Sequence, residues 1–215
     1  MRILALADEE VPAFYDCYVP GRLKGYDLIV SCGDLHAKYL SFIVTMAHVP
    51  VMYVHGNHDE RYALKPPEGC DCIDDKLVVY KGLRILGLGG SYRYRPGKHQ
   101  YTDTEMRRRI AKLKWKILWH RGVDVVVSHA PLKGVGDGED FAHQGFQEFL
   151  RFVDRYHPKY WIHGHVHMNY GADGIREREY NGTKIINAFE RYVLEIPESE
   201  IPTVSKKGDI DYSFY

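Results

Sequence analysis

The sequence lacks three features that would place it in large classes of protein. No apolar run approaches the roughly 18 residues that a membrane-spanning helix requires. Neither sign of charge dominates, because Lys and Arg together number 29, as do Asp and Glu. Cysteine is sparse, with four irregularly spaced residues. We therefore expect no membrane span and no disulfide framework, and any attraction to nucleic acid or anionic lipid must come from a local cluster of charge.

The start of the chain shows no sign of an export signal. Met1 and Arg2 lead directly into an apolar run of strand length, without a basic stretch or a long apolar segment. Cys32 lies inside an apolar run, where a thiol is normally buried and reduced. We therefore predict a cytoplasmic protein with reduced cysteines.

Length and composition are typical of one globular domain. The chain has 215 residues, of which 45% are hydrophobic and 27% charged, and it contains no internal repeat. Short apolar runs alternate with helix-like segments, a pattern that favours a layered α/β fold. We predict a single domain over residues 1–215.

Local signals predict several individual elements. Thr102 and Glu105 have the spacing of a capping box, which predicts a helix to about Arg121 with Gly122 at its C-terminus. The dipeptides at 81–82 and 181–182 predict hairpins. Further helices are predicted over residues 36–47 and 141–156, and a loop over residues 65–75.

Five apolar runs each lead to side chains that can bind a metal ion. The runs begin near residues 3, 28, 51, 123 and 161 and have the composition of buried strands. Ligand sites in α/β sheets form beyond the carboxyl ends of the strands, so we expect these side chains to meet in one crevice. The candidate ligands are Asp8, Glu10, Asp34, Asn57, His129, His165 and His167.

Carboxylates, imidazoles and an amide in one crevice suit the hydrolysis of a phosphoester. Two divalent ions about 4 Å apart generate a bridging hydroxide at neutral pH and neutralise the phosphoryl oxygens. Such a pair needs one carboxylate able to bridge both ions. A single Asp after a strand is more often a turn former or helix cap, so the whole set carries the inference.

Four sequence blocks resemble the signature of the calcineurin-like metallophosphoesterase superfamily, in the same order. They are Gly33-Asp34, Gly56-Asn57-His58-Asp59, Ser128-His129-Ala130-Pro131 and Gly164-His165-Val166-His167. The stretch 123–167 is also similar to small bacterial members. The resemblance spans residues 8–167 and implies a two-sheet α/β sandwich flanked by helices, in four layers, with a dinuclear site at the strand ends.

The resemblance also implies a role for each site residue. Asp34 would bridge the ions, and His58 would be the catalytic acid that protonates the leaving oxygen. One ion would be held by Asp8, Glu10 and His167, and the other by Asn57, His129 and His165.

The chain departs from the superfamily pattern at two places. The first block is normally Asp-x-His, but here Glu10 stands at the histidine position. A carboxylate favours Mn²⁺ or Mg²⁺ over Zn²⁺, so two Mn²⁺ ions are predicted, with Mg²⁺, Fe, Ni²⁺ or Zn²⁺ as alternatives. Ala37 and Lys38 stand where the protein Ser/Thr phosphatases have Asp and Arg, which argues against that activity. The partner of His58 stays open between His36 and a later acid.

The predicted function is hydrolysis of a phosphoester substrate, with a phosphodiester favoured. Two alternatives are a nuclease and a non-catalytic binding module that keeps the metal site. His36 and His143 are further candidates beside the substrate. His55 and His163 fit supporting positions behind the ligands rather than direct ligation.

The segment 93–121 is strongly basic, with ten basic residues and two acidic ones. Together with nearby Tyr and Trp residues, this segment could bind a nucleic acid backbone. We favour a different interpretation, in which the basic residues form the solvated face of a helix. The helix would bury an apolar stripe of Met106, Ile110, Leu113 and Ile117.

Overall fold

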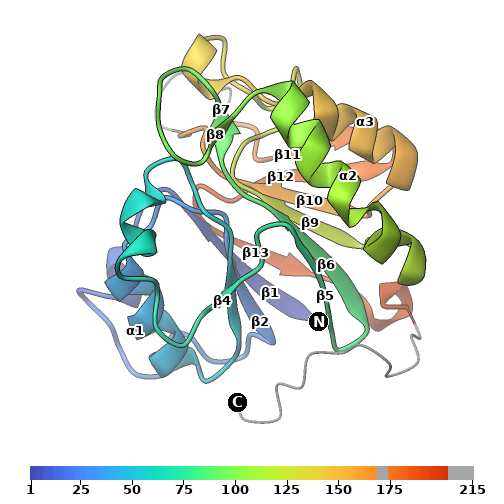
Figure 1. The fold of residues 1–215 in the computed structure, drawn as a ribbon. Helices are drawn as coiled ribbons and strands as arrows, with labels where there is room; N and C mark the ends of the chain where they lie inside the picture. Colours follow the sequence, from blue (N-terminus) through green and yellow to red (C-terminus); the bar gives the residue numbers. More distant parts are fainter. Residues whose placement is uncertain (169–173, 203–215) are drawn as a thin grey trace.

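Two β-sheets pack face to face at the centre of the computed structural model, which describes residues 1–168 and 174–202 (Figure 1). The first sheet contains β1 (Arg2–Ala7), β2 (Leu28–Ser31), β3 (Val51–Tyr53), β4 (Asp71–Cys72) and β13 (Glu190–Glu195). The second contains β5 (Lys76–Tyr80), β6 (Leu83–Leu88), β9 (Val125–Ser128), β10 (Tyr160–His163), β11 (Glu177–Tyr180) and β12 (Thr183–Asn187). A small ribbon is formed by β7 (Ser91–Tyr92) and β8 (Gln100–Tyr101).

Parallel pairing dominates both main sheets. The first has the order β13-β1-β2-β3-β4, in which only β13 runs antiparallel to its neighbour. The second has the order β11-β12-β10-β9-β6-β5, with parallel pairing from β12 through β6. Parallel strands are covered on both faces, which explains their continuous apolar sequences.

Helices cover the outer face of each sheet and complete four layers. Helix α1 (Ala37–Ala47) lies on the first sheet, whereas α2 (Asp103–Trp119) and α3 (Gln147–Tyr156) lie on the second (Figure 1). Successive residues of a strand point to opposite faces of the sheet, so they pack into different hydrophobic cores. Ile3 packs between the sheets, and its neighbour Leu4 packs toward α1. The four-layer α/β sandwich predicted from the sequence is therefore the observed fold.

The start of α2 follows from local sequence. The backbone N–H of Glu105 donates to Thr102 Oγ1 at 3.3 Å, and the Thr102 N–H donates to Glu105 Oε2 at 2.8 Å. This confirms the predicted capping box. The helix ends at Trp119, two residues earlier than predicted, where Arg84 Nη1 donates to the His120 carbonyl oxygen at 2.9 Å.

The predicted helix over residues 141–156 is wrong in its first part. A 3₁₀ turn, η3 (Phe141–His143), is followed by extended backbone, and α3 begins only at Gln147. The break arises because Gly145 lies against the Leu132 backbone so closely that a Cβ there would approach the Leu132 carbonyl carbon to 2.3 Å. The Phe146 N–H also donates to the Pro131 carbonyl oxygen at 3.2 Å.

Both predicted hairpins are present. Asn181 and Gly182 have φ values of 48° and 77°, and Lys81 and Gly82 have values of 47° and 83°. Two consecutive residues with positive φ are typical of the tight turns that match strand twist. The predicted loop over residues 65–75 contains the short strand β4, which pairs with β3. Within the described part of the chain, no helix has the length and apolar character needed to cross a membrane.

Candidate metal centre

The sheets bring most of the predicted ligands to their carboxyl ends. Asp8 follows β1, Asp34 follows β2, and His165 follows β10. All three have positive φ, at 66°, 58° and 69° respectively. Non-glycine residues in this region cost about 1–3 kcal/mol each and concentrate at functional sites. The chain therefore turns sharply at each strand end and directs the side chains into one place.

Three of these side chains form a compact group. Potential ligand atoms of Asp34, His129 and His165 all lie within 4.8 Å of one another. Asp34 Oδ2 lies 3.3 Å from His129 Nε2. Both histidines are buried. Two ligand atoms about 2 Å from a shared ion are about 3–4 Å apart, as Asp34 Oδ2 and His129 Nε2 are, so the group is close to the geometry that a divalent ion requires.

Backbone carbonyls fix the orientation of both imidazoles. His129 Nδ1 lies 2.8 Å from the Cys32 carbonyl oxygen, and His165 Nε2 lies 2.8 Å from that of Ala142. A carbonyl oxygen only accepts, so each of these nitrogens carries a proton. The other nitrogen of each ring is the one left for a metal ion. Metal-binding histidines are commonly held in this way.

Asn57 completes the surroundings of His129. Its Oδ1 lies 3.0 Å from His129 Nε2, and its Nδ2 donates to the Tyr94 hydroxyl at 3.3 Å. Tyr94 thus turns the amide oxygen toward His129. Tyr94 has no recognisable signal for this role in the sequence, because its contact with Asn57 joins residues 37 positions apart.

Asp8 and two glycines pack tightly around the group. Both Asp8 carboxylate oxygens lie 3.0 Å from the His165 backbone nitrogen, which donates to them. A Cβ on Gly164 would lie 2.7 Å from Asp8 Oδ2, and one on Gly56 only 2.1 Å from Asp34 Oδ1. Glycine at these two positions lets the backbone approach the carboxylates.

Asp59 is a supporting residue to which the sequence analysis gave no role. Its side chain is buried, and Oδ2 accepts from the backbone N–H groups of Asp34 at 2.9 Å and Gly56 at 2.7 Å. The carboxylate thus ties the end of β2 to the end of β3. Its place at the end of Gly56-Asn57-His58-Asp59 was the available signal, but an acid at the start of a helical turn usually indicates only a cap.

The electrostatics of the site suit a cation. Burial, together with the neighbouring Asp34 carboxylate and against the opposing effect of His129, raises the pKa of Asp8 to about 7. Burial opposes the charge of Asp34, but His129 holds its pKa at about 2. Burial lowers the pKa of His165 to about 3, which leaves this ring neutral and able to ligate. Burial opposes a charge on His129, but the Asp34 carboxylate raises the pKa of His129 to about 9, so a divalent ion would bind in place of a proton of this ring. Carboxylates and imidazoles that have lost that proton are a donor set that divalent ions bind.

The remaining predicted residues lie outside this compact group. Glu10 Oε1 is paired with His36 Nδ1 at 2.7 Å, and the His36 side chain is 84% exposed. The His167 ring packs on Phe189 with centroids 4.9 Å apart. The His58 side chain is exposed, while its backbone N–H donates to Asp34 Oδ1 at 2.8 Å.

Comparison of the sequence with known protein families identifies the family of this chain. A sequence model described as calcineurin-like phosphoesterase matches residues 9–169, which is most of the chain. The chain belongs to the calcineurin-like phosphoesterase family. The expected family resemblance is thereby confirmed, and with it a general role in metal-dependent phosphoester hydrolysis.

Relatives of this phosphoesterase include two proteins of Caenorhabditis elegans. UPF0046 protein C25E10.12 is 25% identical over 201 residues, covering 78% of this chain and 69% of that protein. UPF0046 protein T07D4.2 is 30% identical over 119 residues, covering 54% of this chain and 27% of that longer protein.

Two solved structures share the fold. The protein TT1561 of Thermus thermophilus superposes with a TM-score of 0.59 at 16% identity, covering 88% of this chain and 89% of that one. A second has a TM-score of 0.64 at 14% identity, covering 90% and 94%. At these identities the likeness concerns the fold alone.

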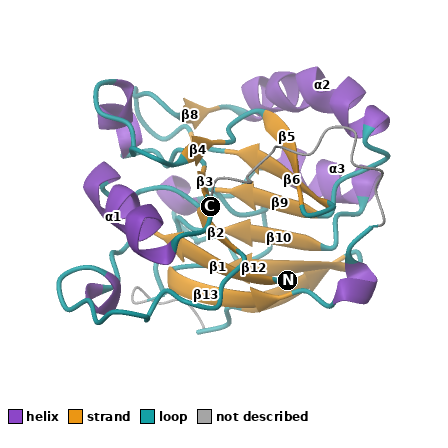
Figure 2. Ribbon diagram, turned by 90° about the horizontal axis from the view of Figure 1, so that it is seen from below, coloured by secondary structure: helices purple, strands orange, loops and turns teal. Residues whose placement is uncertain are grey.

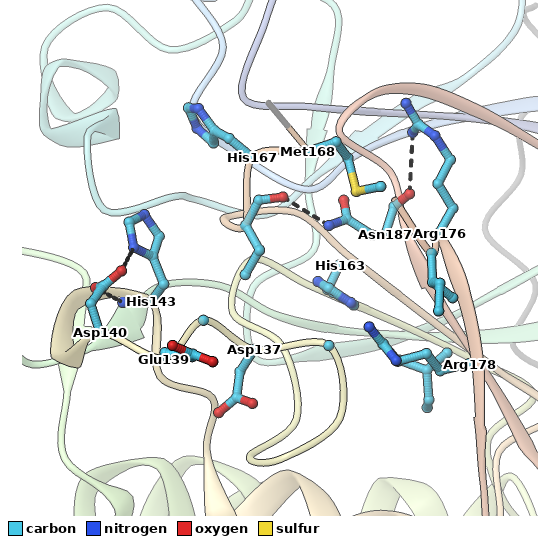
Figure 3. A pocket seen from close by; sticks show the side chains of 15 residues that line it. Asp137, Glu139, Asp140, His143, His163, His167, Met168, Arg176, Arg178 and Asn187 are labelled. Atoms are coloured by element: carbon cyan, nitrogen blue, oxygen red, sulfur yellow. Dashed lines mark hydrogen bonds and ion pairs between the residues drawn. The ribbon is translucent and has the colours of Figure 1, made fainter. Parts of the chain in front are cut away.

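A cleft of about 850 Å³ reaches the compact group of the phosphoesterase through His143, whose ring contacts that of His165. His143 and His167 line it together with Arg176 and Arg178 (Figure 3). The His143 ring lies 5.2 Å from that of His165 and is paired with Asp140 at 2.7 Å. His143, which the sequence suggested as a residue beside the substrate, therefore lies next to the candidate ligand His165 and lines the cleft.

His163 lines the same cleft from the end of β10. Its Nδ1 donates to the Gly164 carbonyl oxygen at 2.9 Å, and burial lowers its pKa to about 4. A neutral, buried imidazole held by the backbone fits the supporting position predicted for this residue. A second cleft of about 580 Å³ contains His58, His36 and Glu10.

His55, Asp74 and His99 form another group of possible ligands in the phosphoesterase. Here the His55 and His99 rings stack in parallel with centroids 4.4 Å apart, so their nitrogens do not point toward a common centre. Asp74 also accepts from the backbone N–H groups of His55 at 3.2 Å and Gly89 at 2.7 Å. We interpret this group as a structural link between the ends of β3 and β6, in agreement with the supporting position predicted for His55.

Proposed function

We propose that the chain is a single-domain phosphoesterase that holds two divalent metal ions and hydrolyses a phosphodiester. The observation that carries the proposal is the convergence of Asp34, His129 and His165, with both imidazoles oriented by backbone carbonyls. Two divalent ions at this position would supply a nucleophile from water and neutralise the phosphoryl oxygens.

Each ion has a proposed set of ligands that shares Asp34. The contacts of Asn57 Oδ1 and Asp34 Oδ2 with His129 Nε2, at 3.0 and 3.3 Å, support a common position for these atoms around one ion. Cation binding there would replace the Nε2 proton. The first set is Asn57, His129 and His165, and the second is Asp8, Glu10 and His167.

His58 is the proposed acid. Its backbone N–H is held by Asp34, whereas its exposed ring borders the second cleft, where a leaving group has room. From this position the imidazole would donate a proton to the departing oxygen. His36 lines the same cleft and is one of the two partners of His58 that the sequence left open.

Glu10 supports the choice of a diester and of Mn²⁺. Its carboxylate adds a negative charge where most of the family has a neutral histidine, so the site would be less positive. A dianionic monoester loses more from that change than a monoanionic diester does. A hard oxygen ligand also favours Mn²⁺ or Mg²⁺ over Zn²⁺.

The nuclease alternative receives less support from the position of the basic segment. The stripe Met106, Leu113 and Ile117 faces the second sheet, so the cations of α2 other than the buried Arg109 face outward. Among the described residues that line the two clefts, none belongs to α2.

The proposal is tested with His58→Ala and with His36→Ala as a matched control from the same cleft. Hydrolysis of diphenyl phosphate by His58→Ala should fall roughly 10²- to 10⁴-fold, the range of general acid catalysis. Hydrolysis of bis(4-nitrophenyl) phosphate should fall much less, because nitrophenolate leaves without a proton. His36→Ala should affect both esters equally. Equal losses for both esters in His58→Ala would contradict the acid role.

Asp34→Asn tests the metal site itself. A neutral amide in place of the shared carboxylate should abolish hydrolysis and lower the Mn²⁺ content measured by elemental analysis, while circular dichroism shows a retained fold. A variant with two ions per chain and normal turnover would refute the proposed site.

A further inference from the structure

The outer face of α2 carries large apolar side chains that the fold does not use. Trp115, Leu118 and Trp119 are 73%, 63% and 81% exposed. Their spacing of three and four residues places them side by side on the helix surface. The third tryptophan of the chain, Trp161, is completely buried. A contiguous exposed apolar patch of this kind is characteristic of an interaction surface.

Positive charge surrounds this patch. The exposed cations on the same helix are Arg107, Arg108, Lys112, Lys114 and Lys116. The acids of α2 are confined to its first turn, where Glu105 caps the helix and pairs with Arg93 at 2.9 Å. From residue 106 to its end the helix contains no acidic residue.

The opposite face of α2 accounts for its folding. Met106, Leu113 and Ile117 are buried in the core between the helix and the second sheet. Arg109, the one buried cation of the helix, donates to Asp75 at 2.9 Å and to the Gly89 carbonyl oxygen at 2.6 Å. The exposed tryptophans and lysines are therefore not needed to hold the helix in place.

The helix is also accessible to a large partner. Figures 1 and 2 place α2 on the outside of the molecule, in Figure 2 along its upper edge. Neither of the two clefts is lined by a residue of α2. A partner can therefore contact the length of this helix without entering the clefts.

We propose that the outer face of α2 docks on an anionic lipid surface. Lys and Arg complement acidic headgroups, and tryptophan side chains prefer the boundary between headgroups and acyl chains. The two signals together match the pattern of helices that lie in the membrane interface. Because the chain as a whole has no net charge, this local cluster must supply the attraction. The proposal is independent of the proposed hydrolysis.

A lipid surface fits the patch better than a nucleic acid does. Single-stranded nucleic acids are bound in grooves, where bases stack on aromatic rings. The patch lies on a convex helix, and Leu118, its third member, offers no ring for stacking. Lys114 Nζ lies 5.6 Å from the centroid of the Trp115 ring, a cation already placed over one of the two exposed indoles.

Intrinsic fluorescence provides a direct test. The full-length protein is titrated with vesicles of phosphatidylcholine alone and with vesicles that also contain phosphatidylserine, and quenching by brominated acyl chains is recorded. Trp161 is buried and should not respond. We expect a blue shift and quenching with the anionic vesicles, weaker binding without phosphatidylserine, and release by salt.

Matched variants separate the contributions. Trp115→Ala/Trp119→Ala should abolish vesicle binding measured by co-sedimentation, while phosphoesterase activity and the melting temperature stay unchanged. Lys112→Gln should weaken binding about fivefold, the effect of one cation near an anionic surface. Lys24→Gln, at an exposed lysine outside α2, should have no effect.

Three results would overturn the proposal. The first is no binding to anionic vesicles at low salt. The second is equal binding by the wild type and the double tryptophan variant. The third is a preference of the same face for another partner, seen either as tighter binding to single-stranded RNA or as a dimer that the double variant disrupts.

Discussion

Asp59 offers the sharpest test of how the candidate metal centre is held together. Its Oδ2 accepts from the backbone N–H groups of Asp34 and Gly56, and the residue is only 4% exposed. Asp59→Ala removes both hydrogen bonds, whereas Asp59→Asn keeps an oxygen that can accept them and removes only the charge. The two variants therefore separate hydrogen bonding from charge.

The expected magnitudes follow from this geometry. A hydrogen bond to a charged group contributes about 1.5–3 kcal/mol, and alanine would also leave two N–H groups without an acceptor. Asp59→Ala should therefore lower the free energy of unfolding by about 3 kcal/mol or more. Asp59→Asn should lower it by only about 1 kcal/mol, because the weaker neutral hydrogen bonds are partly offset by removal of a charge that the site opposes. Burial and the Asp34 carboxylate raise the pKa of Asp59 to about 6.

Enzymatic activity should also fall more in Asp59→Ala than in Asp59→Asn. The lost hydrogen bonds fix the turn that carries Asp34, and a displacement of about 1 Å can reduce turnover about 100-fold. Urea unfolding at a fixed Mn²⁺ concentration measures stability, and kcat/KM for bis(4-nitrophenyl) phosphate over a Mn²⁺ titration measures function. Asp59→Asn should retain most of the activity at saturating Mn²⁺.

Two results would refute this reasoning. If Asp59→Ala unfolds within about 0.5 kcal/mol of the wild type, the range of ordinary surface substitutions, the two hydrogen bonds do not stabilise the site. If Asp59→Asn is as damaging as Asp59→Ala, the charge of Asp59 matters more than its capacity to accept hydrogen bonds.

Three further predictions follow from the site. Chelation should lower the melting temperature, because Asp8 and Asp34 would lose the cations that balance their charges; calorimetry with metal loss confirmed checks this, and an unchanged temperature contradicts it. Gly56→Ala should abolish activity and destabilise the fold, because its Cβ would lie 2.1 Å from Asp34 Oδ1; normal turnover would show that the carboxylate can move away. Glu10→His should raise monoesterase activity relative to diesterase activity, measured as kcat/KM for matched nitrophenyl esters; an equal or lower ratio at full metal occupancy would refute the charge argument for Glu10.

Local sequence determined the elements whose signals lie within a few residues. The capping box at Thr102 and the turn at Asn181-Gly182 depend on contacts between near neighbours, and both are present as expected. The apolar runs that form β1, β2 and β9 were evident because strands buried on both faces need continuous apolar sequence. Their carboxyl ends then indicated where ligand side chains would lie.

Tertiary structure decided the features that depend on distant segments. The helix expected over residues 141–156 is interrupted because Gly145 meets the backbone of Leu132, a contact that no helical periodicity reveals. The strand β4 has two residues and exists only because β3 offers an edge to pair with. Such short elements carry too little local signal to be predicted.

The same distinction applies to the candidate metal centre. The types of residue and their places at strand ends were evident in the sequence, because each follows directly from a recognisable run. Which ring nitrogen of each histidine is free to bind a metal ion was not evident in the sequence. It depends on the Cys32 carbonyl, 97 positions from His129, and on the Ala142 carbonyl, 23 positions from His165. The pairing of Glu10 with His36 and the hold of Asp59 on the Asp34 backbone likewise join different loops. Sequence thus determined which candidate donors lie at the strand ends, and only the packing of two sheets decided which atoms of those side chains face one another.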